Sequence, residues 1–256
     1  DDFNQEYGCI PYRTEGLAAR EFVNRMYPEG NLIGVDAWER VRKDYVFLAA
    51  ADWARSSGRT GRLLAGVGPG GRLVICSEAL IPGGAPQRAR GVFKEMDAAE
   101  RAEVSYTIMG RDAFSEESNG LSVAQQLAPQ GSGITLVPCP ARLEDAVARM
   151  NDLFLMPPLV KGEEEPAEDA GWPELVIVKD RCPELVKQLR TVMLSQIGGK
   201  TQGTKDLMDC LRMLVMAQER AHAVRPRAYR PERSFDDPDE FRGPYNRYGE
   251  PIEGRV

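Results

Sequence analysis

Continuous apolar runs alternate with amphipathic stretches along most of this chain, and the alternation predicts a mixed α/β domain. The segment Val46–Asp52 is apolar up to its last residue, as expected of a central strand buried on both faces. Two further apolar runs, 62–67 and 72–77, flank a Gly-Pro-Gly-Gly sequence that is a strong β-hairpin signal. The three runs together predict an antiparallel meander whose first strand ends at Asp52.

The later segments alternate between helical and strand patterns. Helical periodicity covers 17–26, 86–103 and 119–127, starts again at Pro140 and at Pro183, and resumes after Thr204 to run to about Val224. Strand patterns end at Asp112 and cover 134–137 and 175–178. This order of elements predicts a ribonuclease H-like α/β fold, with a three-strand antiparallel meander plus parallel strands in one mixed sheet that is flanked by helices.

The same pattern divides the chain into three parts. Residues 45–224 hold nearly all the predicted strands and helices, whereas 1–44 consist mainly of turns and are expected to be a linker. Residues 225–256 are rich in Pro, Arg and Asp without periodicity, so they are predicted to form a flexible tail. The first residue is Asp1 rather than Met, which suggests a fragment of a longer chain or a processed product.

Composition and charge exclude several classes of protein. No apolar run approaches the roughly 20 residues of a membrane span, so none is expected. The five cysteines lack CxxC spacing and no secretion signal is present, so reduced thiols in a cytosol are expected. The only histidine is His222, which disfavours both a zinc site and a histidine general base. A net charge of −6 argues against a protein that coats nucleic acid through bulk positive charge.

Acidic residues stand at places that suit a metal site. Asp52 and Asp112 each close an apolar strand, and Asp209 lies in the first turns of an apolar helix, three residues after Asp206. In isolation, Asp52 and Asp112 are more simply explained as turn residues that end a strand. The helix dipole explains Asp206 well and Asp209, about a turn further in, less well. Together, two strand-end carboxylates and one helix carboxylate suit a site that gathers Mg²⁺ at one end of a sheet, because Mg²⁺ prefers oxygen ligands.

Basic residues follow the first of these acids. Residues 53–77 contain no acid, and they include Arg55, Arg59, Arg62 and Arg72. A single arginine here is most simply a solvated surface residue. Four of them beside a candidate metal site favour contacts to phosphate, which position a protein on DNA without reading its sequence.

Several short motifs, in this order, resemble the C-terminal nuclease domain of the large terminase subunits of tailed bacteriophages. Segment 3–9 resembles the Glu-Tyr segment that closes the family's ATPase domain, and 50–53 resembles the first nuclease strand with its metal-binding Asp. The other similar segments are 110–112 with 120–123 and 133–136, 142–153 with 173–177 and 182–189, and 205–212. The last is similar to a helix with the pattern Asp-His-x-x-Asp-Ala-Leu-Arg, and Asp206 stands where many members carry His.

The resemblance implies a DNA endonuclease that cuts concatemeric double-stranded phage DNA during genome packaging by two-metal phosphodiester hydrolysis. Two Mg²⁺ or Mn²⁺ ions would be held by Asp52, Asp112 and Asp209, with Asp206 as a further ligand or an outer group. Phosphates would be held by Arg55, Arg59, Arg62 and Lys205. By the same resemblance, 1–44 would include the end of the ATPase domain. The partners would be double-stranded DNA, that ATPase domain, the small terminase subunit and the portal protein, in the host cytoplasm.

Two other functions are compatible with the sequence. One is a packaging-motor module with latent or no cleavage, which grips DNA and docks on the portal through its tail. The other is an actin-like sugar or acetate kinase, which shares the sheet topology. That class needs an Asp-x-Gly-x-Thr loop after the first strand, and this chain has Asp-Trp-Ala-Arg-Ser from Asp52 onward, which disfavours it.

Overall fold

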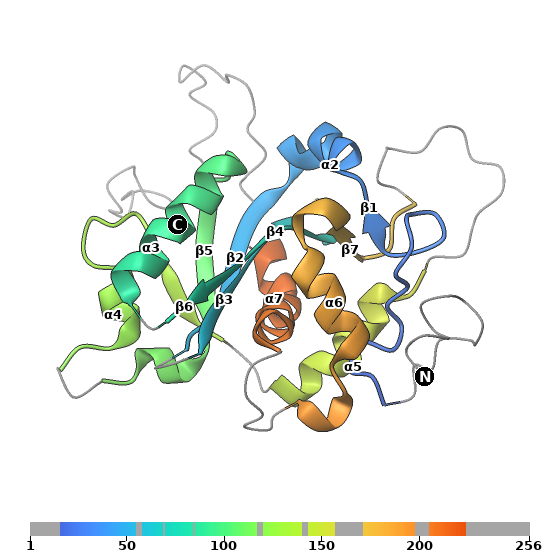
Figure 1. Ribbon diagram of the computed structural model, residues 1–256. Helices are drawn as coiled ribbons and strands as arrows, with labels where there is room; N and C mark the ends of the chain where they lie inside the picture. The colour runs from blue at the N-terminus through green and yellow to red at the C-terminus, as the bar shows by residue number, and fades with distance from the viewer. Residues whose placement is uncertain are drawn as a thin grey trace, which may run out of the picture. The chain divides into compact units, whose positions relative to one another are not determined.

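A computed structural model describes residues 16–54, 58–68, 70–83, 85–116, 120–139, 143–156, 171–197 and 205–223, without the side chains of 143, 144 and 219–223. In these residues a seven-stranded sheet has the order β1-β7-β4-β3-β2-β5-β6 (Figure 1). The strands are β1 (Leu32–Ile33), β2 (Val46–Asp52), β3 (Arg59–Val67), β4 (Leu73–Pro82), β5 (Val104–Met109), β6 (Leu136–Pro138) and β7 (Leu175–Val178).

The sheet combines the predicted meander with parallel strands. β2, β3 and β4 pair antiparallel in succession, while β5 pairs parallel with β2 and β6 pairs parallel with β5. On the other side of the meander, β7 pairs parallel with β4, and β1 pairs parallel with β7. In this arrangement β2 lies between antiparallel β3 and parallel β5, which is the ribonuclease H-like topology, so the predicted fold class is confirmed.

Helices cover both faces of the sheet. The α-helices are α2 (Val35–Val41), α3 (Pro86–Ala99), α4 (Val123–Leu127), α5 (Leu143–Phe154), α6 (Pro183–Thr191) and α7 (Asp206–Ala223). Short 3-10 helices are η1 (Arg42–Asp44), η2 (Arg111–Phe114), η3 (Lys179–Arg181) and η4 (Leu194–Gln196). One core layer contains residues of α5, α6 and α7, and the opposite face packs against α2, α3 and α4 (Figure 1).

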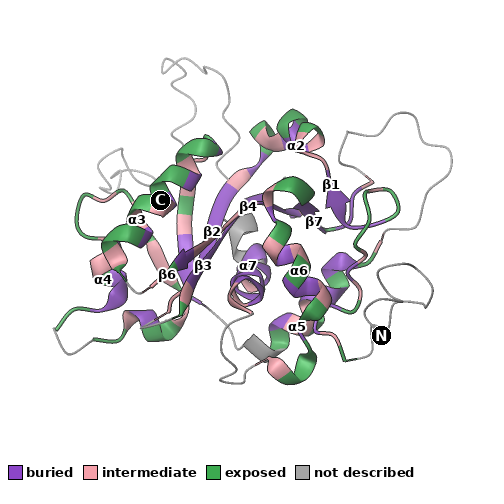
Figure 2. Ribbon diagram, viewed as in Figure 1, coloured by how far each residue is buried: buried purple, intermediate pink, exposed green. Residues whose placement is uncertain are grey.

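Strand β2 shows why its sequence has no polar alternation. Leu48 and Ala50 pack in the layer with α5, α6 and α7, whereas Ala49 and Ala51 pack on the opposite face. Side chains of a strand alternate between faces, so a strand covered on both sides must be apolar throughout. Figure 2 shows the buried centre of the sheet between exposed helix faces.

The N-terminal part of the described chain differs from the prediction. Residues 17–26 form turns rather than a helix, and their apolar side chains Ala18, Ala19 and Phe22 pack into the layer with α7. Residues 16–44, predicted as a linker, also contribute β1 at a sheet edge and α2. The motif at 3–9 and the tail 225–256 lie outside the described residues.

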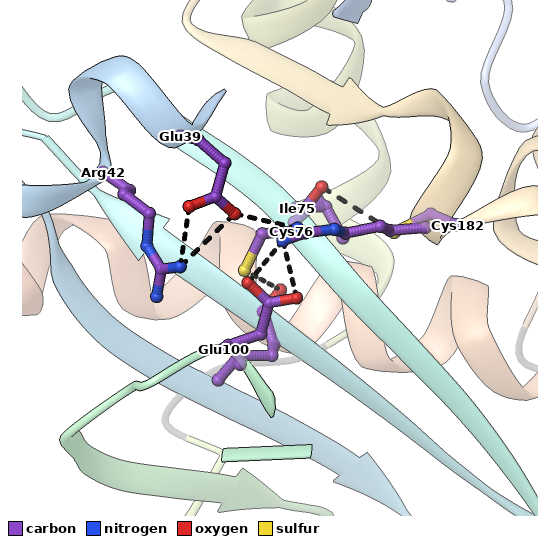
Figure 3. A network of polar contacts seen from close by, with 8 residues as sticks. Glu39, Arg42, Ile75, Cys76, Glu100 and Cys182 are labelled. Carbon is purple, nitrogen blue, oxygen red and sulfur yellow. Dashed lines mark hydrogen bonds and ion pairs between the residues drawn. The ribbon is translucent and has the colours of Figure 1, made fainter. Parts of the chain in front are cut away.

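An ion-pair network fastens α2 to the body of the domain (Figure 3). Arg181 of η3 donates to both carboxylate oxygens of Glu100, at 2.8 and 2.7 Å, and to Glu39 of α2 at 2.8 Å. Arg42, the residue that follows α2, also donates to Glu39, at 3.1 Å. Burial raises the pKa of Glu100, and Arg181 opposes that effect, so the bidentate pair keeps this buried carboxylate compatible with its site.

The thiols beside this network are structural. The described cysteines Cys76, Cys139, Cys182 and Cys210 are all buried thiols. Burial raises the pKa of the thiols of Cys76, Cys182 and Cys210 well above the usual value, which keeps them protonated and unreactive. Among the described helices, none has the length and apolar character needed to cross a membrane.

Candidate metal and nucleic-acid site

Two of the predicted aspartates lie at one end of the sheet because two parallel strands end there. Asp52 is the last residue of β2, and Ala51 beside it pairs with Met109, the last residue of β5. The chain then enters η2, which contains Asp112. A Cβ on Gly110 would lie 2.6 Å from Oδ1 of Asp112, so the Asp112 side chain folds back over the end of β5.

The N-terminus of α7 reaches the same end of the sheet. Asp52 pairs across the meander with Gly61 of β3. A Cβ on Gly61 would lie 3.0 Å from backbone atoms of Asp206 and 3.1 Å from its Cβ, so the first turn of α7 packs directly on the β3 backbone. On α7, Cys210 contacts the backbone of Asp52. The glycine therefore allows the close approach that places helix carboxylates beside a strand-end carboxylate.

A side chain from another helix fixes the start of α7. Oε1 of Gln188, on α6, accepts hydrogen bonds from the backbone N–H groups of Leu207 and Met208, both at 3.1 Å. These are first-turn donors that have no partner within their own helix. Gln188 is only 2% exposed. It therefore acts as an N-cap supplied from a neighbouring helix, whereas the predicted cap, Thr204, lies outside the described residues.

The acids interact through their charges. The pKa of Asp52 is raised from 3.8 to about 7, first by burial and then by the charges of Asp209, Asp206 and Asp112. Burial also raises the pKa of Asp206 and of Asp209. Several carboxylates that share a poorly solvated region disfavour each other's ionised form. A bound cation would relieve this repulsion, so the electrostatics favour cation binding at this end of the sheet.

Three basic side chains compensate part of the negative charge. Nε of Arg59 lies 3.7 Å from Oδ2 of Asp206, and Nζ of Lys205 lies 3.9 Å from Oδ2 of Asp209. Nη1 of Arg212 donates to Oδ1 of Asp209 at 2.7 Å, and the Arg212 side chain is buried. Arg212 therefore fixes one oxygen of Asp209, and the other faces Lys205.

The donor set matches a hard divalent cation in its chemistry. Oδ2 of Asp206 is buried and accepts no hydrogen bond from the described residues, which leaves a carboxylate oxygen suited to an ion. As the side chains lie, however, the described part of the chain contains no group of three or more His, Cys, Asp or Glu residues positioned to hold a metal ion. Arg59, Lys205 and Arg212 occupy the surroundings of the α7 acids instead.

The predicted phosphate-binding residues do not all lie at the acidic site. Arg59 and Lys205 lie at the acidic site, and Arg55 is outside the described residues. The prediction that Arg62 binds DNA phosphate is wrong, because its side chain is 1% exposed and cannot reach DNA. It donates to Asp97 at 2.7 Å and to the carbonyl of Phe93 at 2.8 Å. Its guanidinium also lies 4.5 Å from the centre of the Phe93 ring.

Arg62 is buried because the side chains of β3 point alternately to the two faces of the sheet. Gly61 faces α7, so the next residue, Arg62, must point to the opposite face, where α3 covers it. Arg72, from the same acid-free stretch, donates to the carbonyls of Trp172 and Pro173. The basic stretch therefore does not form one phosphate-binding surface.

Sequence reasoning missed three residues that shape the site: Gly61, Gln188 and Arg212. A glycine inside a strand pattern is a signal of close backbone approach, and Arg212 follows Asp209 at the i, i+3 spacing of helix ion pairs. The role of Gln188 had no signal in the sequence, because it depends on how α6 packs against α7.

No family model and no curated protein sequence matches the chain. Solved structures with a similar fold include the nuclease domain of the phage P22 large terminase, with 13% identity and a TM-score of 0.49 over 69% of this chain and 82% of that one. The large terminase nuclease domain of bacteriophage SPP1, with bound Mn, has 13% identity and a TM-score of 0.48 over 75% and 97%. The human cytomegalovirus terminase nuclease domain has 11% identity and a TM-score of 0.41 over 88% and 97%.

The first two are nuclease domains of large terminases, as are the proteins that the sequence motifs resemble, and the third is a terminase nuclease domain of a human virus. At such identities the similarity concerns the fold alone.

Proposed function

We propose that this chain is a metal-dependent endonuclease that hydrolyses double-stranded DNA during phage genome packaging. The observation that supports the proposal is the gathering of Asp52, Asp112, Asp206 and Asp209, from three separate segments, at one end of a ribonuclease H-like sheet. Burial, and after it the charges of the other three aspartates, raises the pKa of Asp52 to about 7. A partly buried cluster of like charges is unfavourable for folding, and clusters of this kind concentrate at functional sites.

The residues have distinct roles in this proposal. Asp52, Asp112 and Asp209 hold two Mg²⁺ or Mn²⁺ ions, which supply Lewis acidity at the scissile phosphate when bound. Arg212 orients Asp209 by holding one of its oxygens, and Gln188 holds the helix turn that carries Asp206 and Asp209. Arg59 and Lys205 are basic residues beside this cluster, and they contact flanking phosphates of the DNA.

The packaging context rests on the sequence motifs. They support a place for this chain beside an ATPase domain, with the small terminase subunit and the portal protein as partners. The contacts with phosphate carry little base information, so cleavage by this domain alone has little sequence preference.

Cleavage of supercoiled plasmid in Mn²⁺ or Mg²⁺ tests the proposal. Asp52→Asn, Asp112→Asn and Asp209→Asn each abolish cutting, whereas Asp44→Asn, an exposed aspartate of η1, leaves it unchanged. Circular dichroism and the thermal midpoint confirm that each variant is folded. Full activity in Asp209→Asn would move the third ligand position to Asp206.

The cleavage assay could instead support the alternative function. Wild-type protein that binds DNA but cuts it in neither metal would be a non-cleaving module of the packaging motor. Calorimetric titration with Mn²⁺ distinguishes the cases further, because the endonuclease binds Mn²⁺ in a manner that Asp52→Asn removes.

A further inference from the structure

Helix α3 carries three basic side chains that have no acidic partner. Arg88, Arg90 and Lys94 make no side-chain hydrogen bond or ion pair with the described residues. Arg88 and Lys94 are exposed, and Arg90 is half-buried. The acids of this helix, Glu95 and Asp97, come after them, and Asp97 is already paired with a buried arginine. The first half of α3 is therefore a local cationic surface on a chain of net charge −6.

These cations do not stabilise the helix that carries them. The first turn of α3 contains Arg88 and no acid. The N-terminus of a helix carries partial positive charge, which favours an acid there and disfavours a cation. Arg90 and Lys94 are four residues apart, so they are neighbours on the helix surface and repel each other. A bound anion would relieve both unfavourable interactions.

Helix α3 begins at the end of the sheet where the aspartates lie. Strand β4 ends at Pro82, which pairs with Arg59 at the start of β3. Two residues further along β3, Gly61 pairs with Asp52. Because α3 starts at Pro86, directly after this end of β4, its first turns enter the fold beside the acidic end.

The packing of the inner face of α3 gives the same direction. Ala89 packs in one cluster with Ala51 and Ala113, the chain neighbours of Asp52 and Asp112. Met96, nearer the end of the helix, packs in another cluster with Phe47 and Ala49, nearer the start of β2. The basic half of α3 is therefore the half that lies toward the aspartates, on the face of the sheet opposite α7.

The outward face of α3 is low between its cations. The buried residues of the helix are Ala89, Phe93 and Met96. Gly91 is exposed on the opposite side, and a Cβ there would meet nothing within 4 Å. With about 3.6 residues per turn, Arg88 falls on one side of Gly91, and Arg90 and Lys94 fall on the other. Figure 2 shows exposed turns along α3, so a large anion can reach this face.

We propose that Arg88, Arg90 and Lys94 form a contact surface for the phosphate backbone of double-stranded DNA beside the acidic end of the sheet. The identity of the polyanion rests on the proposed function, and the proposal adds a second basic surface to the one at Arg59 and Lys205. A duplex presents closely spaced charges along a stiff backbone and needs no pocket to be bound. Protein partners usually need large apolar or aromatic anchors, and no residue of α3 is an exposed large hydrophobic.

Binding of the full chain to a short duplex in a chelator, over a series of salt concentrations, tests the proposal without involving the metal. The test variant combines Arg88→Gln, Arg90→Gln and Lys94→Gln. Each lost phosphate contact lowers the slope of log affinity against log salt by about 0.9, so the slope is expected to fall by about 2 to 3. At about 0.1 M salt the affinity falls roughly tenfold or more. The loss is equal for two duplexes of unrelated sequence, because phosphate contacts do not read bases.

A matched control removes the same charge from the other end of the sheet. Lys43 and Arg101 precede the starts of β2 and β5, and Lys179 lies in η3, whose Arg181 pairs with Glu39 of α2. All three control residues are exposed, and none forms an ion pair with the described residues. Replacing these three by Gln leaves the salt slope unchanged. An equal loss in the control and test variants would show a general effect of net charge and overturn the proposal.

Two measurements separate binding from folding. The thermal midpoint of the test variant is at least that of the wild type, because Gln is a good helix former and the repulsion is gone. A variant with Arg88→Lys and Arg90→Lys keeps the charge and retains the salt slope of the wild type. Loss of DNA binding in this charge-preserving variant would contradict a role through phosphate charge.

Failure of this proposal differs from failure of the proposed function. Equal duplex affinity in the wild type and the test variant would overturn the surface and favour an acidic protein partner for α3, whereas plasmid cleavage by the wild type would still support the nuclease. A wild type that binds DNA through α3 but cuts plasmid in neither Mn²⁺ nor Mg²⁺ would overturn the nuclease and support the surface. A wild type that binds no duplex, even at low salt, would overturn the surface.

Discussion

Replacement of Asp52 by Asn removes a charge that is unfavourable to the fold, so the variant is expected to be more stable than the wild type while losing the proposed activity. The side chain of Asp52 is partly buried at the end of β2, and three other aspartates repel its ionised form. Asn has nearly the same shape and no charge. The substitution therefore keeps the packing and relieves the repulsion.

The size of the effect follows from the pKa of Asp52. It rises from 3.8 to about 7 in the folded protein, and a tenfold change in proton affinity corresponds to about 1.4 kcal/mol. Above pH 7 the folded chain holds an ionised Asp52 at a cost of up to roughly 4 kcal/mol, which Asn removes. Water that reaches the partly exposed carboxylate lowers this figure, so a gain of roughly 2 to 4 kcal/mol is expected at pH 8.

The raised pKa of Asp52 also determines how the stability of the wild type changes with pH. Between 3.8 and about 7 the unfolded chain has lost the Asp52 proton and the folded chain retains it, so wild-type stability falls as pH rises through this window. Below 3.8 both states are protonated, and the advantage of Asn disappears. Urea denaturation of both proteins at about pH 4, 6 and 8, in the presence of a chelator, measures the difference directly.

Two results would refute this reasoning. One is an Asp52→Asn protein no more stable than wild type at pH 8, and the other is a gain that does not change with pH. Asp44→Asn serves as the control, because Asp44 is exposed and should show neither effect. Saturating Mn²⁺ should reverse the order of stability, since a ligand that binds the folded wild type alone stabilises it by mass action.

Two further predictions concern the packing of α7. Gly61→Ala places a methyl group about 3.0 Å from the backbone of Asp206, so it should weaken Mn²⁺ binding in calorimetry and destabilise the fold by about 1–3 kcal/mol. Gly66→Ala meets Trp38 instead and should destabilise the fold without changing Mn²⁺ affinity; equal metal affinity in both variants would contradict the assignment. Gln188→Met removes the acceptor of two first-turn N–H groups, so it should cost about 1 kcal/mol and speed hydrogen exchange at the start of α7. Gln125→Met, which weakens the cap of α4, should leave that exchange unchanged.

Much of the fold could be predicted because its central strands are apolar on both faces. The run that became β2 and the Gly-Pro-Gly-Gly turn between β3 and β4 are strong local signals. β1 gave no such signal, because two residues have no periodicity and their strand conformation comes from pairing with Ile177 and Val178. The prediction of a helix over 17–26 was wrong, because this segment forms turns whose apolar residues pack into the layer that contains α5, where Phe22 contacts Phe154.

The candidate site, like the fold, could be predicted only in part from the sequence. The sequence by itself determined that carboxylates follow two strands and enter one helix, because strand ends and helix starts are encoded by neighbouring residues. Only the tertiary structure decided that Arg59 reaches Asp206 while Arg62 is buried under α3, and that a side chain of α6 caps α7. Strand register and helix packing set the direction of each side chain, and both depend on segments far apart in the chain.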